Sequence, residues 1–302
     1  MDIDIGEFLI FIICGIGTGV FLYRWYKWTF SGWPPERNKN AKYIFSVLPV
    51  ISLVIILYTL NNFASFDVVD DMVYIVFYVV IGFAWIYMGL TAISIFFDIS
   101  WIDDALNLNN NAAIIAIAGG FLGITIIYSG SNIGDGPGWW CVFFAGGLGL
   151  IAWIILGLAV HVVTKIFYKI TVERDVYCGI RTGAYFLAGG IILARASAGD
   201  WTSFSATVIE FLDGWPVLVL TALMIAVELY LIRYINNSKP KFNSYSKSNI
   251  NTDTTANILY VSIAVGIFYI IFAIASVILL PPLPKNSFYA ELAILMNRVI
   301  MV

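Results

Sequence analysis

The chain has 302 residues, of which 61% are hydrophobic and 12% are charged, and its formal net charge is −3. Soluble domains carry roughly 25% charged residues, so this chain has about half of the charge that a water-facing surface requires. The composition excludes a soluble enzyme, a nucleic-acid-binding protein and a disulfide-stabilised secreted domain. It predicts an all-α protein, a polytopic transmembrane helix bundle.

Eight apolar runs follow one another along the chain, each long enough to cross a bilayer core of about 30 Å. They cover roughly residues 7–24, 43–62, 73–97, 111–129, 139–164, 177–197, 214–235 and 256–280. These runs are continuously apolar, whereas the strands of a membrane barrel alternate. The sequence therefore predicts eight spans arranged as four helical hairpins. The residues before the first run are acidic, unlike those of a signal peptide, so we expect that run to be retained as a span.

Basic residues gather in the connectors at one end of the predicted bundle. The connectors after the first, fifth and seventh runs hold twelve of the sixteen basic residues. Because Lys and Arg favour the cytoplasmic side, these connectors are predicted to be cytoplasmic and both termini to lie outside. The connector at 98–110 is an exception, since it carries three acids and no base. The opposite connectors are acidic and rich in Gly and Trp, which predicts turns and interfacial anchors; a cation-attracting outer surface and a Ca²⁺ site are alternatives.

Two polar or amphipathic segments interrupt or follow the spans. The connector at 235–255 is rich in Asn, Ser and Lys, which is typical of a mobile loop. After three prolines between 281 and 284, apolar residues recur at helical spacing from Phe288 to Val299. This spacing predicts an amphipathic interfacial helix in the tail.

Asn or Thr residues precede the second helix of three of the four hairpins. The clearest such turn is Asn109-Asn110-Asn111-Ala112-Ala113, and residues 38–41 and 254–257 resemble it. Asn and Thr are good helix N-caps, so these turns predict a repeated hairpin unit. The turn at 174–179 departs from the pattern. Because each unit has two spans, the repeats must be parallel, and they can surround a central path or form a solid bundle.

Small residues form faces on the three middle spans that follow the 98–110 connector. Such faces predict close packing between membrane helices, with a gating or oligomer interface as the alternative. The residues of the predicted packing face are Gly119, Gly120, Gly123, Gly146, Gly149, Gly189 and Gly190.

The stretch from Tyr74 to Trp201 resembles the YjfL-like bacterial inner-membrane family, a four-helix module of unknown function. The resemblance rests on the turn at 109–113, on Gly120-Phe121-Leu122-Gly123 and on Ala188-Gly189-Gly190. It implies a bacterial inner-membrane location and brings no catalytic or binding residues. It divides the chain into a divergent hairpin at 1–72, a central module at 73–201, a second divergent hairpin at 202–282 and the tail at 283–302.

Ionisable residues at membrane depth are the first candidates for function. Glu228 lies five residues before Arg233, which places it about 7–8 Å from the predicted cytoplasmic end. It either pairs with a base near the interface or handles a proton or cation. His161 is expected at the interface or in a proton relay. Arg195, Glu210 and Asp213 surround one outer corner, where they predict a salt bridge or an anion site.

The sequence has one histidine, and its three cysteines lie in or beside apolar runs. Neither pattern has the spacing of a metal site or a disulfide framework, and no nucleophile–base motif is present. We therefore expect no catalytic residues, no cofactor and no metal, and a protein that is not an enzyme.

The leading functional hypothesis is a channel- or transporter-like bundle for a small cation. Its predicted pathway residues are Glu228, His161, Arg195, Glu210 and Asp213. The alternative is a non-catalytic structural or sensory subunit of a membrane complex, which the resemblance to the YjfL-like family associates with envelope stress. The expected partner is the lipid bilayer, nucleic acid is excluded, and a homo-oligomer or a membrane-complex partner is left open.

Overall fold

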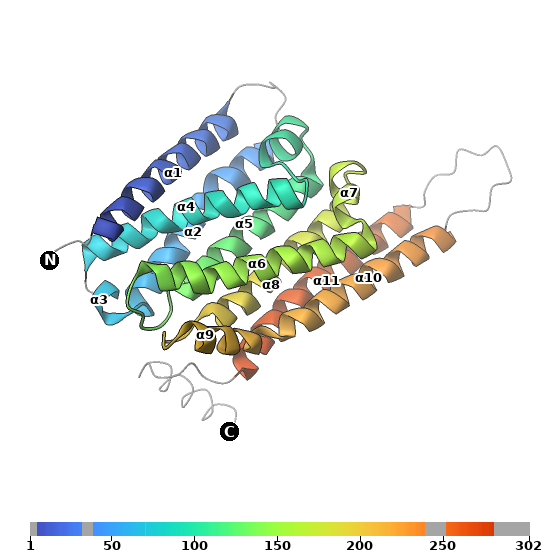
Figure 1. The fold of residues 1–302 in the computed structure, drawn as a ribbon. Coiled ribbons are helices and arrows are strands. Elements are labelled where there is room, and N and C mark those ends of the chain that lie inside the picture. The colour runs from blue at the N-terminus through green and yellow to red at the C-terminus, as the bar shows by residue number, and fades with distance from the viewer. Residues whose placement is uncertain (1–4, 32–38, 70, 239–251, 281–302) are drawn as a thin grey trace, which may run out of the picture.

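The computed structural model describes residues 5–31, 39–69, 71–238 and 252–280. Eight of its helices are long and apolar enough to cross a membrane, which confirms the predicted polytopic helix bundle. They are α1 (Ile5–Phe30), α2 (Lys39–Asn62), α4 (Met72–Phe96), α5 (Asn111–Ser131), α6 (Trp139–Thr164), α8 (Val176–Ser197), α10 (Pro216–Ser238) and α11 (Thr252–Leu279) (Figure 1).

Several predicted connectors contain short helices. These are α3 (Phe66–Val69), the π-helix η1 (Trp101–Asn107), α7 (Ile166–Thr171), α9 (Phe204–Phe211) and the 3₁₀ turn η2 (Leu212–Gly214). The apolar runs of the sequence do not predict these short helices, because each is too short to cross a membrane. The 235–255 connector is also shorter than predicted, since α10 reaches Ser238 and α11 begins at Thr252. The rest of that loop and the predicted tail helix lie outside the described residues.

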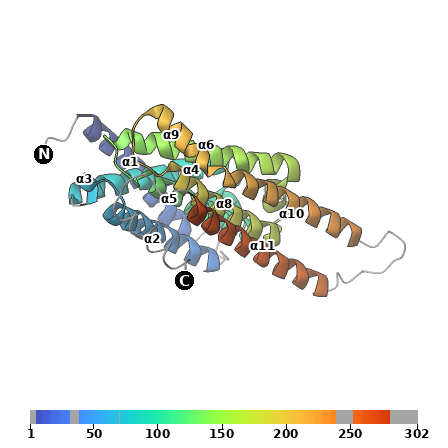
Figure 2. The same ribbon diagram turned by 90° about the horizontal axis from the view of Figure 1, so that it is seen from below.

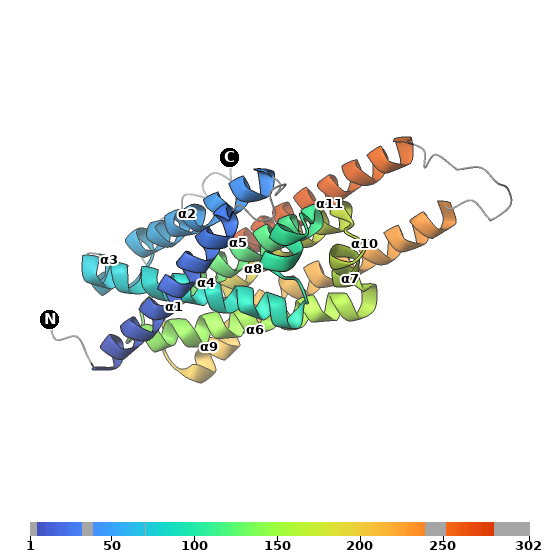
Figure 3. The same cartoon turned by 90° about the horizontal axis from the view of Figure 1, so that it is seen from above.

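The helices surround a central pair formed by α5 and α8. Helices α1, α2 and α4 lie on one side of this pair, and α10 and α11 lie on the other (Figures 1 and 2). We call the end that holds η1, α7 and the starts of α5 and α8 the α7 end. The opposite end, with α3, the 132–138 loop and α9, is the α9 end (Figure 3).

The backbones of α5 and α8 are in direct contact along their length. A Cβ atom added to Gly190 would lie 2.5 Å from Cα of Gly123, and one added to Gly183 would lie 2.6 Å from the carbonyl oxygen of Ile115. A Cβ on Gly119 would overlap the backbone carbonyl of Gly183. Only residues without a side chain allow two helices to approach this closely. The interface between α5 and α8 is therefore closed and leaves no room for a path.

The turns that lead into α5 and α8 have the same local geometry. Asn110 caps α5 by accepting bonds from Ala112 and Ala113, and Asp175 caps α8 in the same way. Each cap follows a residue with positive φ, Asn109 at 51° and Arg174 at 55°. The turn at 174–179 thus departs from the turn at 109–113 in sequence but not in form, because Asp and Asn are equally good N-caps. The predicted turn at 254–257 is wrong, since these residues lie within α11. The internal repeat and its domain limits stay predictions.

Candidate functional site

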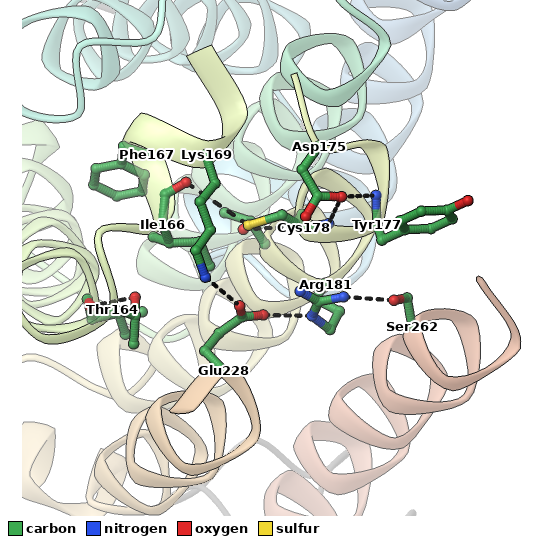
Figure 4. A network of polar contacts seen from close by, with 12 residues as sticks. Thr164, Ile166, Phe167, Lys169, Asp175, Tyr177, Cys178, Arg181, Glu228 and Ser262 are labelled. Carbon is green, nitrogen blue, oxygen red and sulfur yellow. Dashed lines mark hydrogen bonds and ion pairs between the residues drawn. The ribbon is translucent and has the colours of Figure 1, made fainter. Parts of the chain in front are cut away.

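The structure places Glu228 at the centre of a buried group of charges. Its side chain, on α10, is wholly shielded from solvent. Its Oε1 atom accepts a hydrogen bond from Nε of Arg181 on α8, and its Oε2 atom lies 3.5 Å from Nζ of Lys169 on α7 (Figure 4). We call Lys169, Arg181, Glu228 and Ser262 the charge cluster.

Arg181 connects Glu228 to a third long helix. Only 3% of Arg181 is exposed, and its Nη1 atom donates to Oγ of Ser262 on α11 over 2.6 Å. The Ser262 hydroxyl donates in turn to the carbonyl of Ile258, one turn earlier on α11. The guanidinium group, with its fixed fork of donors, therefore joins α8, α10 and α11 (Figure 4).

The short helix α7 brings Lys169 to the cluster. Its other face is anchored because Ile166, Phe167 and Ile170 are buried, and the Phe167 ring lies 4.5 Å from that of Phe97. The Lys169 side chain extends from the α7 end of the bundle toward Glu228, and 17% of it is exposed to solvent. The cluster thus contains two bases and one acid, and it is connected to the surface through Lys169.

Burial determines the energetics of this cluster. Removing a charge from water is costly unless a partner of opposite sign and good hydrogen bonds compensate it. Oε1 of Glu228 has such a bond, whereas Oε2 has an ion-pair contact but no hydrogen bond among the described residues. Oε2 is therefore the carboxylate oxygen whose burial is compensated by the charge of Lys169 alone among the contacts of the described residues.

Further polar groups continue from the cluster along the same three helices. Tyr269 on α11 is fully buried, and its hydroxyl has no hydrogen-bond partner in the described residues. The hydroxyls of Tyr185 on α8 and Thr221 on α10 lie 2.9 Å apart. Thr221 precedes Glu228 by seven residues, and Tyr269 follows Ser262 by seven, so this polar seam extends the cluster by about 10 Å. We define the polar seam as Tyr185, Thr221 and Tyr269.

Only part of this arrangement was predicted. Glu228 was predicted to pair with a base near the interface, and Lys169 of the α7 connector is such a base, but the second partner, Arg181 within α8, was not predicted. The available signal was Arg181 itself, a base within an apolar run, because charges inside a membrane usually pair with one another. Lys169 and Ser262 gave no comparable signal.

His161 lies outside the charge cluster. Its Nδ1 atom accepts a bond of 3.2 Å from the backbone N–H of Phe167, and its ring stacks on that of Phe167 at 4.7 Å. These contacts hold the start of α7 against the end of α6. His161 therefore helps to position the helix that carries Lys169.

The remaining predicted pathway residues lie at the opposite end of the bundle. Arg195 follows Arg181 by fourteen residues on α8, which corresponds to about 21 Å. Glu210 on α9 is within electrostatic range of Arg195 and Asp213. The structure therefore divides the five predicted residues into two separate groups.

The predicted glycine faces have several different neighbours. Gly119, Gly123 and Gly190 lie between α5 and α8, whereas the space beside Gly120 is occupied by Ile93 of α4. Gly146 and Gly149 lie against the serine side chains of Ser131 and Ser197, and Gly189 faces Trp153. Gly130, Gly179 and Gly183 also belong to the α5–α8 contact, and of these only Gly183 lies on a small-residue face that the sequence predicted.

Metal ligands do not gather in the part of the chain that the structure describes, since no three His, Cys, Asp or Glu residues there are close enough to hold an ion. The three cysteines are buried and unbridged. No family model, curated protein or solved structure matches this chain. The resemblance to the YjfL-like family accordingly stays a prediction, and what is established is an integral multi-span membrane protein.

Proposed function

We propose that this multi-span membrane protein is a non-enzymatic transporter for a small cation, and that the proton is the cation handled by the charge cluster. One observation carries the proposal: Glu228 is wholly buried within a membrane span, and its Oε2 atom has no hydrogen bond among the described residues. Ionisable groups at membrane depth are costly, and they commonly mark ion pathways and proton relays.

The proton fits this cluster better than a metal cation does. A metal ion requires several oxygen ligands around it, whereas a proton requires one lone pair. Oε2 of Glu228 is enclosed, and the carboxylate is flanked by the Lys169 ammonium group and the Arg181 guanidinium group, neither of which can act as a metal ligand while it is protonated. A proton can also reach a carboxylate along a chain of hydrogen-bonded groups, without an open channel.

A transporter is favoured over an open channel because the centre of the bundle is closed. The α5 and α8 backbones touch, so no path runs between the middle hairpins. The polar groups lie instead between α8, α10 and α11. Protonation of Glu228 removes the only acid of the cluster and leaves Arg181 and Lys169 as unpaired bases, which favours a rearrangement of α7 and α10.

The test is proton flux into proteoliposomes that contain a pH-sensitive dye, driven by a potassium gradient with valinomycin. Wild-type protein is expected to acidify the vesicles, and Glu228→Gln to abolish this flux. Glu173→Gln changes an exposed acid near α7 and serves as the matched control. If folded wild-type protein carries no proton, sodium or potassium flux under any gradient, the proposal is wrong.

A structural or sensory subunit is the second candidate, and the rigid contact between α5 and α8 favours it. In that case the charge cluster serves to hold three helices in register. This role predicts no flux and a stoichiometric partner that remains bound through purification in mild detergent.

A further inference from the structure

A pocket at the α9 end of the bundle has an acidic and polar lining. It lies between the starts of α1 and α4, the 132–138 loop, the first turns of α6, the end of α8 and helix α9. The charged side chains that line it are all acids: Glu7, Asp135 and Glu210. A pocket of this kind attracts positive charge.

The side chain of Asn132 independently indicates a ligand in this pocket, because it is buried and one of its polar atoms has no hydrogen-bond partner in the described residues. Only 6% of Asn132 is exposed, and its Nδ2 atom donates to the carbonyl of Tyr128 over 2.7 Å. A carbonyl can only accept, so the orientation of the amide is fixed and Oδ1 is the other atom. Oδ1 has no hydrogen-bond partner in the described residues although Asn132 lines the pocket. A buried acceptor without a partner calls for a donor from a ligand.

A second orphaned group lies in the same lining. Ser197, near the end of α8, is also 6% exposed, and its hydroxyl, which lies beside Gly149 of α6, has no hydrogen-bond partner in the described residues. The lining further contains the aromatic residues Tyr74, Tyr78 and Trp201. Aromatic faces attract organic cations in addition to packing against their alkyl groups.

The walls of the pocket are preorganised by hydrogen bonds between its two loops. The N–H of Gly199 donates to Ile133, and the N–H of Trp201 donates to the carbonyl of Asp135 over 2.7 Å. The N–H of Asp135 donates to Oδ1 of Asp200 over 2.9 Å. Because the loops are already joined, a ligand does not have to order them, which favours binding.

From this lining we infer that the pocket binds a small primary alkylammonium ion. The N–H groups of the ammonium ion can donate a hydrogen bond to Oδ1 of Asn132, and its positive charge is attracted by the acids of the lining. The alkyl part can pack against the aromatic side chains. A metal ion fits less well, because the described residues bring no three His, Cys, Asp or Glu together. This inference is independent of the proposed function, since binding here does not require transport.

Isothermal titration calorimetry of the purified full chain in detergent provides the test, with n-butylammonium chloride as the probe. We expect saturable binding of one ion per chain. Butan-1-ol, which has a similar shape without the charge, is expected not to bind. Glu210→Gln is expected to weaken binding about tenfold, which corresponds to about 1.4 kcal/mol. Glu173→Gln, which removes an exposed acid at the opposite, α7 end of the bundle, is the matched control and is expected to leave the affinity unchanged.

A second variant, Asn132→Leu, removes the unused acceptor and is expected to weaken binding as well. If it fails to fold, Glu210→Gln still decides the question, because Glu210 is only partly buried. If butan-1-ol bound as tightly as n-butylammonium, the pocket would be a site for apolar groups and not for a cation. If K⁺ or Ca²⁺ displaced n-butylammonium at comparable concentrations, the pocket would be a site for inorganic cations. Either result, or an unchanged affinity of Glu210→Gln, would overturn the inference. Binding without flux would contradict only the proposed function.

Discussion

Arg181 on α8 and Glu228 on α10 form an ion pair in which both side chains are almost completely shielded from solvent. Neither charge would be tolerated alone at this depth, since an unpaired buried ion costs several kcal/mol. Because each charge requires the other, the pair fixes α8 and α10 relative to one another, although the two residues are 47 positions apart in the chain. It also makes the energetics of the pair testable.

The double substitution of this pair is expected to cost less stability than either single substitution. Glu228→Leu or Arg181→Met alone is expected to lower the free energy of unfolding by about 3–5 kcal/mol, because the remaining charge stays buried without its partner. The double variant is expected to recover most of this loss. Reversible unfolding by SDS in mixed micelles measures all four proteins. A double variant as unstable as either single variant would show that the pair is not the relevant interaction.

Gly119→Ala is expected to separate α5 from α8. The added methyl group would overlap the backbone carbonyl of Gly183, which cannot rotate away as a side chain can. Overpacking of this kind typically costs about 1–3 kcal/mol. Gly147→Ala is the control, because no atom lies within 4 Å of the added Cβ. Equal thermal stability of the two variants would contradict the close contact.

Asn110 has two roles that substitution can separate. Its Oδ1 caps α5, and its Nδ2 donates to the carbonyl of Ile170 over 2.7 Å. Asn110→Ser keeps a capping oxygen and loses the amide donor, whereas Asn110→Ala loses both. We expect a loss of about 1 kcal/mol for Ser and about 2–3 kcal/mol for Ala in the free energy of unfolding. The same loss in both variants would mean that only the bond to Ile170 matters.

Asp104 in η1 is expected to make stability depend on pH. Burial raises its pKa above the ordinary value, and the nearby charges of Asp98 and Asp103 raise it further, while the Ser100 N–H and Arg174 act in the opposite direction. The folded protein therefore binds this proton more tightly than the unfolded chain. The resulting stability is present at low pH and is lost as the pH rises through the raised pKa.

Asp104→Asn is expected to remove this dependence. Asn has no charge to bury and keeps an oxygen that can accept from the Ser100 N–H, as Asp104 does over 2.7 Å. The variant should unfold at a higher temperature than wild type at neutral pH. The difference should disappear below the ordinary Asp pKa of about 3.9. A constant difference across a pH 3–8 thermal series would assign the effect to packing instead of ionisation.

The eight spans, the cap at Asn110 and the burial of Glu228 followed from the sequence because each depends on local composition or spacing. The partners of Glu228 did not, because hydropathy shows that a helix is buried but not which helices adjoin it. Lys169 was assigned to a connector, since nothing in a six-residue segment indicates that α7 folds back against the bundle. Gly183 was seen as small, but its contact with α5 depends on the rotation of two helices about their axes.

Contact between the backbones of α5 and α8 also limits which parts of the protein can move. Two helices that interlock through glycines cannot slide past one another without a collision of main-chain atoms, so they form a fixed internal frame. Helices that move must then lie at the periphery of the bundle, where they contact the α5–α8 pair through side chains and not through backbone atoms. Helix α10 is one of these helices, because it meets α8 through side chains, in the Arg181–Glu228 ion pair and the Tyr185–Thr221 hydrogen bond.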